Sequence, residues 1–250
     1  MTDEKIALFA SWLKEAKNAV FFGGAGVSTE SGVPDFRSKN GLYNQHDVRF
    51  EGYSPEYLLS HDCLENEPKV FFEFYRQKMD ARRVLPNPAH RMLAKWEKEG
   101  KVRAVVTQNI DSLHQKAGSR NVFEIHGTTR INFCSRCQKP YPEDFLFDSP
   151  EPVPRCECGG TVRCAVTLYG ESLPEKAVQG AVDAIRRADL LIIGGTSLTV
   201  YPAASYVDFF RGGHLVIVNR DPLSYPLREG RDLQINAPIG EVFSAVDRLL

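Results

Sequence analysis

The stretch FFGGAGVS at residues 21–28 decides the fold, because an apolar run ends there in glycines and small residues. The run Ala19–Phe22 predicts a buried strand, and a glycine turn after a strand lets backbone approach a phosphate closely. The segment GVPDFR at residues 32–37 follows at once and places a carboxylate, an aromatic ring and a guanidinium side by side. Together these segments predict a bound dinucleotide with reactive groups beside it.

The glycine turn departs from the usual dinucleotide pattern at one position. Gly24 and Gly26 fit the first two glycines of G-x-G-x-x-G, but Thr29 stands where the third is expected. From the glycines alone, a strand-to-helix turn without a ligand stays open beside a phosphate-binding turn. The adjoining Asp35-Phe36-Arg37 favours the phosphate-binding turn, because an ordinary loop seldom carries such groups in that place.

Composition and charge narrow the class of protein. The chain has 250 residues, 42% of them hydrophobic and 25% charged, which is typical of a globular protein with a substantial core. The net charge of -1 gives no electrostatic footprint for nucleic acid or an anionic membrane, so we expect neither as a partner. No apolar run approaches the roughly 18 residues of a spanning helix, and the N-terminus lacks a signal-peptide core. These features predict a cytoplasmic protein.

The order of the predicted elements indicates an α/β fold. Strands are predicted at 19–22, 102–106, 122–125, 190–193 and 215–218, and helices at 3–17, 68–80, 88–100, 174–188, 202–210 and 238–250. Wholly apolar strands flanked by helices predict a doubly wound parallel, Rossmann-like sheet covered on both faces. Two irregular stretches, about 38–83 and 130–164, interrupt the alternation. We therefore expect Rossmann-like parts at 1–37, 84–129 and 165–250, a helical insertion with a cofactor-binding loop at 38–83, and a smaller zinc module at 130–164.

The cysteines of the second interruption resemble a zinc ribbon. Cys134-x2-Cys137 is followed after 18 residues by Cys156-x-Cys158. Four thiolates close a tetrahedral shell around Zn²⁺ and leave no open position, which predicts one structural zinc per chain. The second pair is one residue short, and Cys164 is a competing fourth ligand. Unligated thiols and a disulfide are the alternatives, of which the disulfide is disfavoured in the cytoplasm.

Polar or glycine residues follow every predicted strand. Gln108, Asn109 and Asp111 follow the second strand, and His126 follows the third. The remaining ones are Gly195-Thr196-Ser197 and Asn219. In open parallel sheets, ligands bind beyond the carboxyl ends of the strands, so these residues are expected to face the same crevice as Gly24–Ser28. Taken singly, Asn109 and Asp111 also suit a turn or helix cap, and His126 a structural histidine.

These motifs, together with Tyr169-Gly170-Glu171, occur in the order seen in sirtuins, and the chain resembles this family of NAD-dependent protein deacylases, of the bacterial type, over about residues 19–240. The resemblance implies the cofactor NAD, consumed as a co-substrate, and acetylated-lysine proteins or peptides as partners. It implies His126 as general base and Asn109 and Asp111 as residues that orient the nicotinamide ribose and carboxamide. The implied cofactor-binding residues are Gly24, Ala25, Gly26, Ser28, Asp35, Phe36, Arg37, Gln108, Gly195, Thr196, Ser197 and Asn219. The implied peptide-binding residues are Thr167, Tyr169, Gly170, Leu198 and Val200, by strand addition.

The resemblance also implies a reaction. The acyl-lysine oxygen attacks the nicotinamide ribose carbon, nicotinamide leaves, and the products are free lysine and O-acetyl-ADP-ribose. Relatives that prefer dicarboxylic acyl groups carry a Tyr-x-x-Arg pair, where this chain has Tyr75-Arg76-Gln77-Lys78. Since lysine lacks the planar fork of arginine, an acetyl or other uncharged acyl group is expected. Mono-ADP-ribosyl transfer and a non-catalytic NAD-sensing module remain as alternatives, while a nicotinamide dehydrogenase is disfavoured by the missing third glycine.

Overall fold

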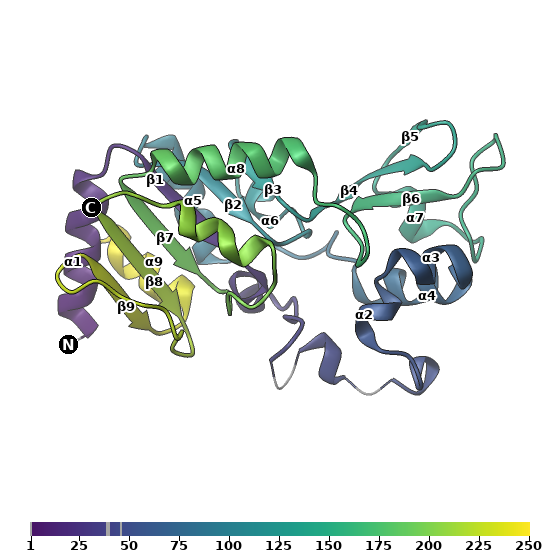
Figure 1. Cartoon of the computed structure of the whole chain (residues 1–250), viewed down its shortest axis with the longest axis horizontal. Helices are drawn as coiled ribbons and strands as arrows, with labels where there is room; N and C mark the ends of the chain where they lie inside the picture. The colour runs from purple at the N-terminus through teal and green to yellow at the C-terminus, as the bar shows by residue number, and fades with distance from the viewer. Residues whose placement is uncertain (1, 39–40, 46) are drawn as a thin grey trace.

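A six-stranded parallel sheet forms the centre of the larger part of the molecule (Figure 1). The structure is a computed structural model that describes residues 2–38, 41–45 and 47–250. The strand order is β3-β2-β1-β7-β8-β9. The strands are β1 (Ala19–Gly23), β2 (Val102–Thr107), β3 (Val122–Glu124), β7 (Leu190–Gly194), β8 (His214–Asn219) and β9 (Asp232–Asn236).

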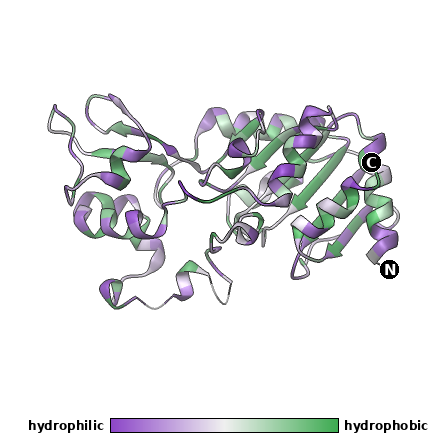
Figure 2. Cartoon of the chain, turned by 180° about the vertical axis from the view of Figure 1, so that it is seen from behind, coloured by the Kyte–Doolittle hydropathy of each residue, from purple (hydrophilic) through white to green (hydrophobic). Residues whose placement is uncertain are grey.

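Helices cover both faces of this sheet. One face packs against α1 (Thr2–Glu15), α5 (Pro88–Lys98) and α9 (Ile239–Asp247), and the other against α8 (Glu175–Arg187) and the 3-10 helix η5 (Ala203–Phe209). Because side chains alternate along a strand, Phe21 enters the first hydrophobic core and Phe22 the second. The strongly hydrophobic strands stand out in green between the helices in Figure 2. The predicted doubly wound parallel sheet is confirmed.

The second part of the molecule is built from two distant stretches of sequence. It combines α2 (Pro55–Leu58), α3 (His61–Asn66) and α4 (Pro68–Lys78) with an antiparallel sheet of β4 (Gly127–Cys134), β5 (Pro140–Tyr141) and β6 (Val162–Val166), joined by α7 (Asp144–Asp148). These elements share a separate hydrophobic core, and Figure 1 shows them at the end of the molecule remote from both termini. The boundaries at 37/38, 83/84, 129/130 and 164/165 stay a prediction, and residues 1, 39, 40 and 46 lie outside the described residues.

Three local predictions need correction. The sixth strand, β9, was not predicted: as an edge strand it buries only Leu233 and Ile235, so its sequence alternates and lacks the apolar run of a central strand. The predicted helix at 202–210 is a 3-10 helix. The irregular stretch before α4 also contains α2, α3 and the short 3-10 turns η3 (Leu42–Asn44) and η4 (Val48–Phe50).

Remaining short elements are α6 (Leu113–Lys116), between β2 and β3, and η1 (Ala25–Val27) and η2 (Thr29–Ser31), after β1. Among the helices within the described ranges, none is both long and apolar enough to cross a membrane.

Candidate active site

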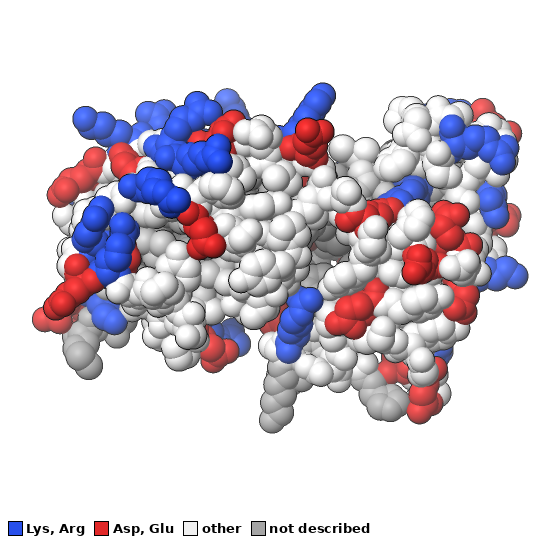
Figure 3. Space-filling model, viewed as in Figure 1, with Lys and Arg blue, Asp and Glu red and all other residues white. Residues whose placement is uncertain are grey.

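A large cleft opens where the winding of the sheet reverses. The chain runs from β1 to β2 on one side of β1 and later places β7 on its other side. Neighbouring loops diverge at such a switch point, and ligands bind there beyond the carboxyl ends of the strands. The cleft has a volume of about 1050 Å³ and lies between the sheet and the second part. In Figure 3 it is a hollow near the middle of the molecule, with charges of both signs scattered around it.

Two glycine segments meet at the floor of this cleft. The Gly26 N–H donates to the Gly195 carbonyl at 2.8 Å, and a Cβ at Gly26 would lie 2.8 Å from that same oxygen. Gly195 has φ +58, and a Cβ there would collide with the Val27 backbone nitrogen. Glycine is therefore required on both strand ends. The turn continues into η1 and η2 with no α-helix behind it, so the third glycine, which serves close helix–strand packing, is not needed at Thr29.

A buried hydrogen-bond network backs the cleft. The Ser28 hydroxyl donates to Asp111 Oδ2 at 2.6 Å, and Asn109 Nδ2 donates to Ser28 Oγ at 3.0 Å. Burial raises the pKa of Asp111, although the hydrogen bonds from Ser28 and from the Leu113 N–H oppose this. Asn109 lines the cleft, whereas Ser28 and Asp111 lie behind it. The structure thus brings the three residues together. Only Asn109 faces the cleft, and Ser28 and Asp111 support it from behind.

His126 lines the cleft with one ring nitrogen fixed. Its Nδ1 lies 3.0 Å from the Gln108 carbonyl oxygen, which accepts only from a protonated Nδ1. Nε2 therefore carries the lone pair in the neutral ring. Burial lowers the pKa of His126, and Arg37 lowers it further. At the next residue, Gly127 has φ +76, and a side chain there would collide with the Ala165 carbonyl.

Hydrogen bonds among Arg37, Tyr43 and Tyr169 connect the predicted cofactor-binding loop to the predicted peptide-binding segment. Arg37 Nη2 donates to the Tyr169 hydroxyl at 3.1 Å, and the hydroxyls of Tyr43 and Tyr169 lie 2.9 Å apart. Phe36 packs edge-on against Tyr43, with ring centroids 5.5 Å apart. Asp35 accepts from the Ser38 N–H at 2.8 Å and so shapes the loop. All of these side chains line the cleft.

The predicted peptide-binding residues lie on two sides of the cleft. The Thr167 N–H donates to the His126 carbonyl at 2.9 Å, and Val200 lines the opposite wall. Tyr169 cannot offer its backbone to an added strand, because its N–H donates to Leu59 and its carbonyl accepts from His61. Gly170 makes no backbone hydrogen bond within the described part of the chain. Leu198 lies outside the cleft lining and has the rare φ of 54°.

The side of the cleft near α4 is apolar. Tyr75 and Met79 line it. Lys78, at the position of the arginine in the Tyr-x-x-Arg pair, points elsewhere: its Nζ lies 3.7 Å from Asp47 and donates to Gln45 at 3.3 Å. No cationic group of α4 belongs to the cleft lining.

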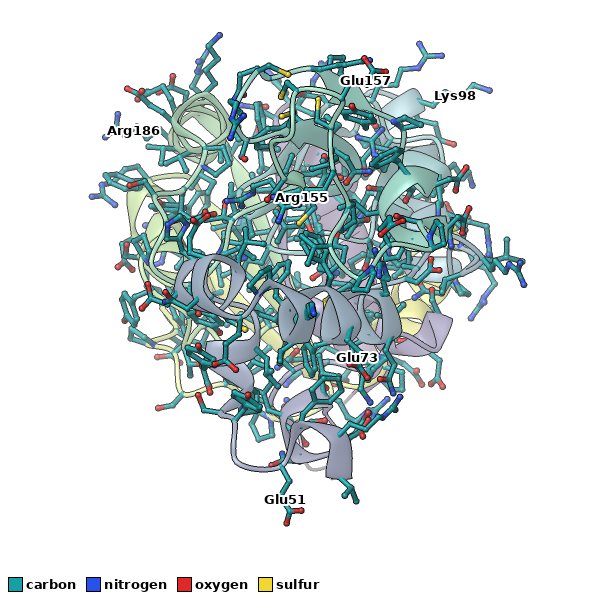
Figure 4. The ribbon with its side chains drawn as sticks, turned by 90° about the vertical axis from the view of Figure 1, so that its right-hand side faces the viewer. Glu51, Glu73, Lys98, Arg155, Glu157 and Arg186 are labelled. Atoms are coloured by element: carbon teal, nitrogen blue, oxygen red, sulfur yellow. The ribbon has the colours of Figure 1, made fainter. Side chains whose placement is uncertain are left out.

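Four cysteine sulfurs converge in the second part of the molecule. The ligand atoms of Cys134, Cys137, Cys156 and Cys158 all lie within 4.8 Å of one another. Hydrogen bonds from the Tyr141 hydroxyl and the Cys158 N–H lower the pKa of Cys156, which favours the thiolate that binds a metal. Four sulfur donors at this spacing fit a tetrahedral zinc ion. In Figure 4 several sulfur atoms gather close to Glu157, at the outer end of the molecule.

The other two cysteines stand apart from this group. Cys164 is fully buried and lies outside the group of four sulfurs. Cys156 and Cys158 therefore complete the group although only one residue separates them, and Cys164 is not its fourth member. Cys63 is buried in the second core.

Several residues that line the cleft were not predicted from the sequence as site residues. They are Glu30, Arg220, Asp221, Pro238 and Ile239. Arg220 and Asp221 directly follow Asn219 at the carboxyl end of β8. Since ligands bind beyond the carboxyl ends of parallel strands, considering two more residues after this strand would have identified them. Pro238 and Ile239 follow β9, and without that strand they carried no signal.

Comparisons with known proteins agree with this geometry. A model of the Sir2 family matches residues 24–202. An NAD-dependent protein deacetylase of Cutibacterium acnes is 50% identical over 99% of this chain and 98% of its own, and one of Clostridium perfringens is 50% identical over 98% and 99%. A Sir2 structure with a deacetylated peptide and 3′-O-acetyl-ADP-ribose has a TM-score of 0.87 at 35% identity, covering 97% of both chains. A Sir2 structure bound to a propionylated peptide has a TM-score of 0.84 at 34% identity, covering 98% of both.

Proposed function

The chain belongs to the Sir2 family and is an NAD-dependent protein deacetylase, and from this premise we propose how its cleft divides the work between cofactor, peptide and base. NAD supplies an electrophilic ribose carbon when nicotinamide leaves. The acetyl group passes from lysine to a ribose hydroxyl of ADP-ribose and one water is consumed, so the products are lysine, nicotinamide and O-acetyl-ADP-ribose.

The floor of the cleft is proposed to hold the adenosine and the phosphates. Gly24, Ala25 and Gly26 offer a turn without side chains that would block a pyrophosphate. Gly195, Thr196 and Ser197, with Asn219, extend this surface across the neighbouring strand ends. The support for this proposal is the close contact between the two glycine segments. Neither Gly26 nor Gly195 could carry a side chain there, so their backbone is what the floor presents to a ligand.

The reactive end is proposed to lie between the cofactor loop and the second strand end. Asp35, Phe36, Arg37 and Gln108 border it, and Asn109 faces it. Asn109 would orient the ribose and carboxamide directly. Asp111 would act through Ser28 and Asn109, because it lies behind the wall.

His126 is proposed as the general base. The hydrogen bond at Nδ1 leaves the lone pair at Nε2, which would take a proton from a ribose hydroxyl. Its position at the edge of both the floor and the Thr167 side of the cleft is the observation that carries the mechanism, since cofactor and acyl-lysine must meet there.

The peptide is proposed to lie extended between Thr167–Gly170 and Leu198–Val200. Pairing on the first side would use Gly170, whose backbone makes no hydrogen bond among the described residues, while Tyr169 contributes its ring. The acyl group would point toward Tyr75 and Met79. We further propose that the preferred acyl groups are uncharged, since Lys78 is engaged by Asp47 and offers no cation to a carboxylate.

An acyl-lysine panel tests these assignments. One peptide carrying acetyl, propionyl or succinyl lysine is incubated with and without NAD and analysed by mass spectrometry. We expect NAD-dependent loss of acetyl and propionyl, with kcat/KM for succinyl at least about 100-fold lower, roughly 2.7 kcal/mol. Succinyl turnover equal to acetyl turnover would refute the uncharged-acyl proposal. Transfer of ADP-ribose to protein without deacylation would support the alternative transferase activity, which the names of the relatives do not favour.

We also propose that the protein works in the cytoplasm, where NAD is abundant and a four-thiol metal site stays reduced. Fractionation of cells with an antibody against the protein tests this, and enrichment in a secreted fraction would contradict it.

A further inference from the structure

The glycine turn after β1 is fixed by side chains from distant elements. In the usual dinucleotide fold a long helix follows the turn and holds it. Here only the short 3-10 helices η1 and η2 follow, and the chain then continues into the predicted cofactor-binding loop. The orientation of Gly24–Gly26 therefore depends on contacts made from outside the turn.

Asn87 makes one of these contacts from the start of α5. Its Nδ2 donates to the Val27 carbonyl at 2.7 Å, across 60 positions of sequence. Its Oδ1 accepts from the Ala89 N–H at 2.9 Å and from the His90 N–H at 3.4 Å, so the same side chain also caps the helix. Asn87 is only 4% exposed and does not line the cleft.

His90 holds Asn87 from behind. The Asn87 N–H donates to His90 Nδ1 at 3.3 Å, which completes a capping box and requires that Nδ1 be unprotonated. Burial lowers the pKa of His90 to about 4, so the ring is neutral at physiological pH. The side-chain amide of Asn87 is thus held through both Nδ2 and Oδ1, and its backbone N–H is held by His90.

A second contact holds the far end of the turn. Glu30 Oε1 accepts from the Gly240 N–H at 3.0 Å, at the first turn of α9. Since α5 and α9 pack on the same face of the sheet, the turn is fastened at Val27 and at Glu30 to one rigid layer.

We propose that Asn87 is a positioning residue for the cofactor: its Nδ2–Val27 hydrogen bond sets the orientation of the Gly24–Gly26 turn that receives the phosphates. This inference rests on the proposed placement of NAD at that turn. Asn87 contacts neither the cofactor nor the reacting atoms, so it acts on binding of the cofactor and leaves the chemical step alone.

Asn87→Ser isolates this contact. Serine caps a helix about as well as asparagine, but its short side chain does not reach Val27 and offers no amide donor. The matched control is Asn121→Ser, because Asn121 Nδ2 also donates to a backbone carbonyl, that of Arg103 at 2.6 Å, outside the cleft lining. The probe is ADP-ribose, which carries the phosphates without the scissile nicotinamide bond, and its Kd is measured by calorimetry.

We expect Asn87→Ser to raise the Kd of ADP-ribose and the KM for NAD about five- to tenfold, the effect of one lost hydrogen bond. The kcat at saturating NAD and the KM for the peptide should change less than about twofold. Asn121→Ser should leave all of these constants at the wild-type values. Asn87→Asp, which also keeps the cap and loses the donor, repeats the test if the serine variant does not fold.

Three results would overturn the inference. Wild-type affinity for ADP-ribose in Asn87→Ser, or an equal loss in Asn121→Ser, would show that the contact is only structural. If the wild-type protein itself fails to bind ADP-ribose, the placement of the cofactor falls, and this inference falls with it.

Discussion

At the scale of single residues, the state of His126 is set by one backbone atom. The Gln108 carbonyl, 18 positions earlier, accepts a hydrogen bond from the Nδ1–H and so leaves Nε2 as the acceptor. Burial destabilises the charged ring, so its pKa is lowered and the ring of the proposed base is neutral at neutral pH. A strand-end histidine was foreseeable from the sequence, whereas its tautomer was not, because the partner is main chain on another strand end.

Replacing this histidine tests its role directly. We expect His126→Ala to lower kcat/KM for an acetyl peptide by about 100- to 10,000-fold, the usual contribution of a general base. The Kd of ADP-ribose should stay within a few-fold of wild type, because the ring supports chemistry rather than the phosphates. Steady-state kinetics and calorimetry measure the two effects.

The pH profile gives a second test of the same residue. Since the pKa of His126 is lowered below 6.5, kcat/KM should be flat around pH 7 and should fall only in the acidic range, as the ring becomes protonated. A profile that still rises steeply between pH 7 and 8 would contradict the role of His126 as the limiting base.

At the scale of elements, the two cysteine pairs, Cys134 with Cys137 and Cys156 with Cys158, come from different segments and form one group of sulfurs. Cys134 closes β4, and Cys156 and Cys158 lie in the turn that leads into β6. A metal bound by all four thiolates would join these segments and stabilise a sheet of three short strands.

We therefore expect Cys158→Ser to lose bound zinc and to unfold the β4–β6 module at lower temperature, with loss of turnover. Cys164→Ser is the matched control, because Cys164 belongs to the same sheet but not to the ligand group. It should keep one zinc per chain. Metal analysis of the purified variants with calorimetric melting decides, and zinc lost from Cys164→Ser would assign the fourth ligand differently.

How far the elements could be predicted depended on burial. Leu190–Ile193 is buried on both faces, so its apolar run alone identified a strand. In β9 only Leu233 and Ile235 are buried, and two apolar residues in alternation do not distinguish a strand from a loop. The carboxyl ends of β1, β2, β3, β7 and β8 therefore located the cleft, while its wall beyond β9 was missed. The support of the glycine turn after β1 by Asn87 and by the contact of Glu30 with α9 was also unpredictable, because each joins residues distant in sequence through a single polar contact.

At the scale of the whole molecule, two buried histidines lie close together, His90 on α5 and His114 on α6. The rings of His90 and His114 are 4.7 Å apart, and His114 also packs against Phe21 of β1. His90 Nε2 and both ring nitrogens of His114 are buried with no hydrogen-bond partner among the described residues. Burial lowers the pKa of both; the charge of Arg91 lowers that of His90 further, and His90 lowers that of His114.

We expect this pair to make the protein less stable in acid. The folded-state pKa of His90 is about 4 against 6.5 for the ordinary side chain, so between these values the unfolded chain binds more protons than the folded one. The free energy of unfolding should therefore be nearly constant above pH 6.5 and fall as the pH drops toward 4, with His90 alone contributing about 2 kcal/mol between pH 7 and pH 5. Urea unfolding at the two pH values measures this. His90→Gln should reduce the difference by that amount, whereas Leu93→Ala, a cavity in the same helix without a titrating group, should lower stability equally at both pH values. An unchanged pH difference in His90→Gln would mean that other groups, such as His114, carry the acid sensitivity of this layer.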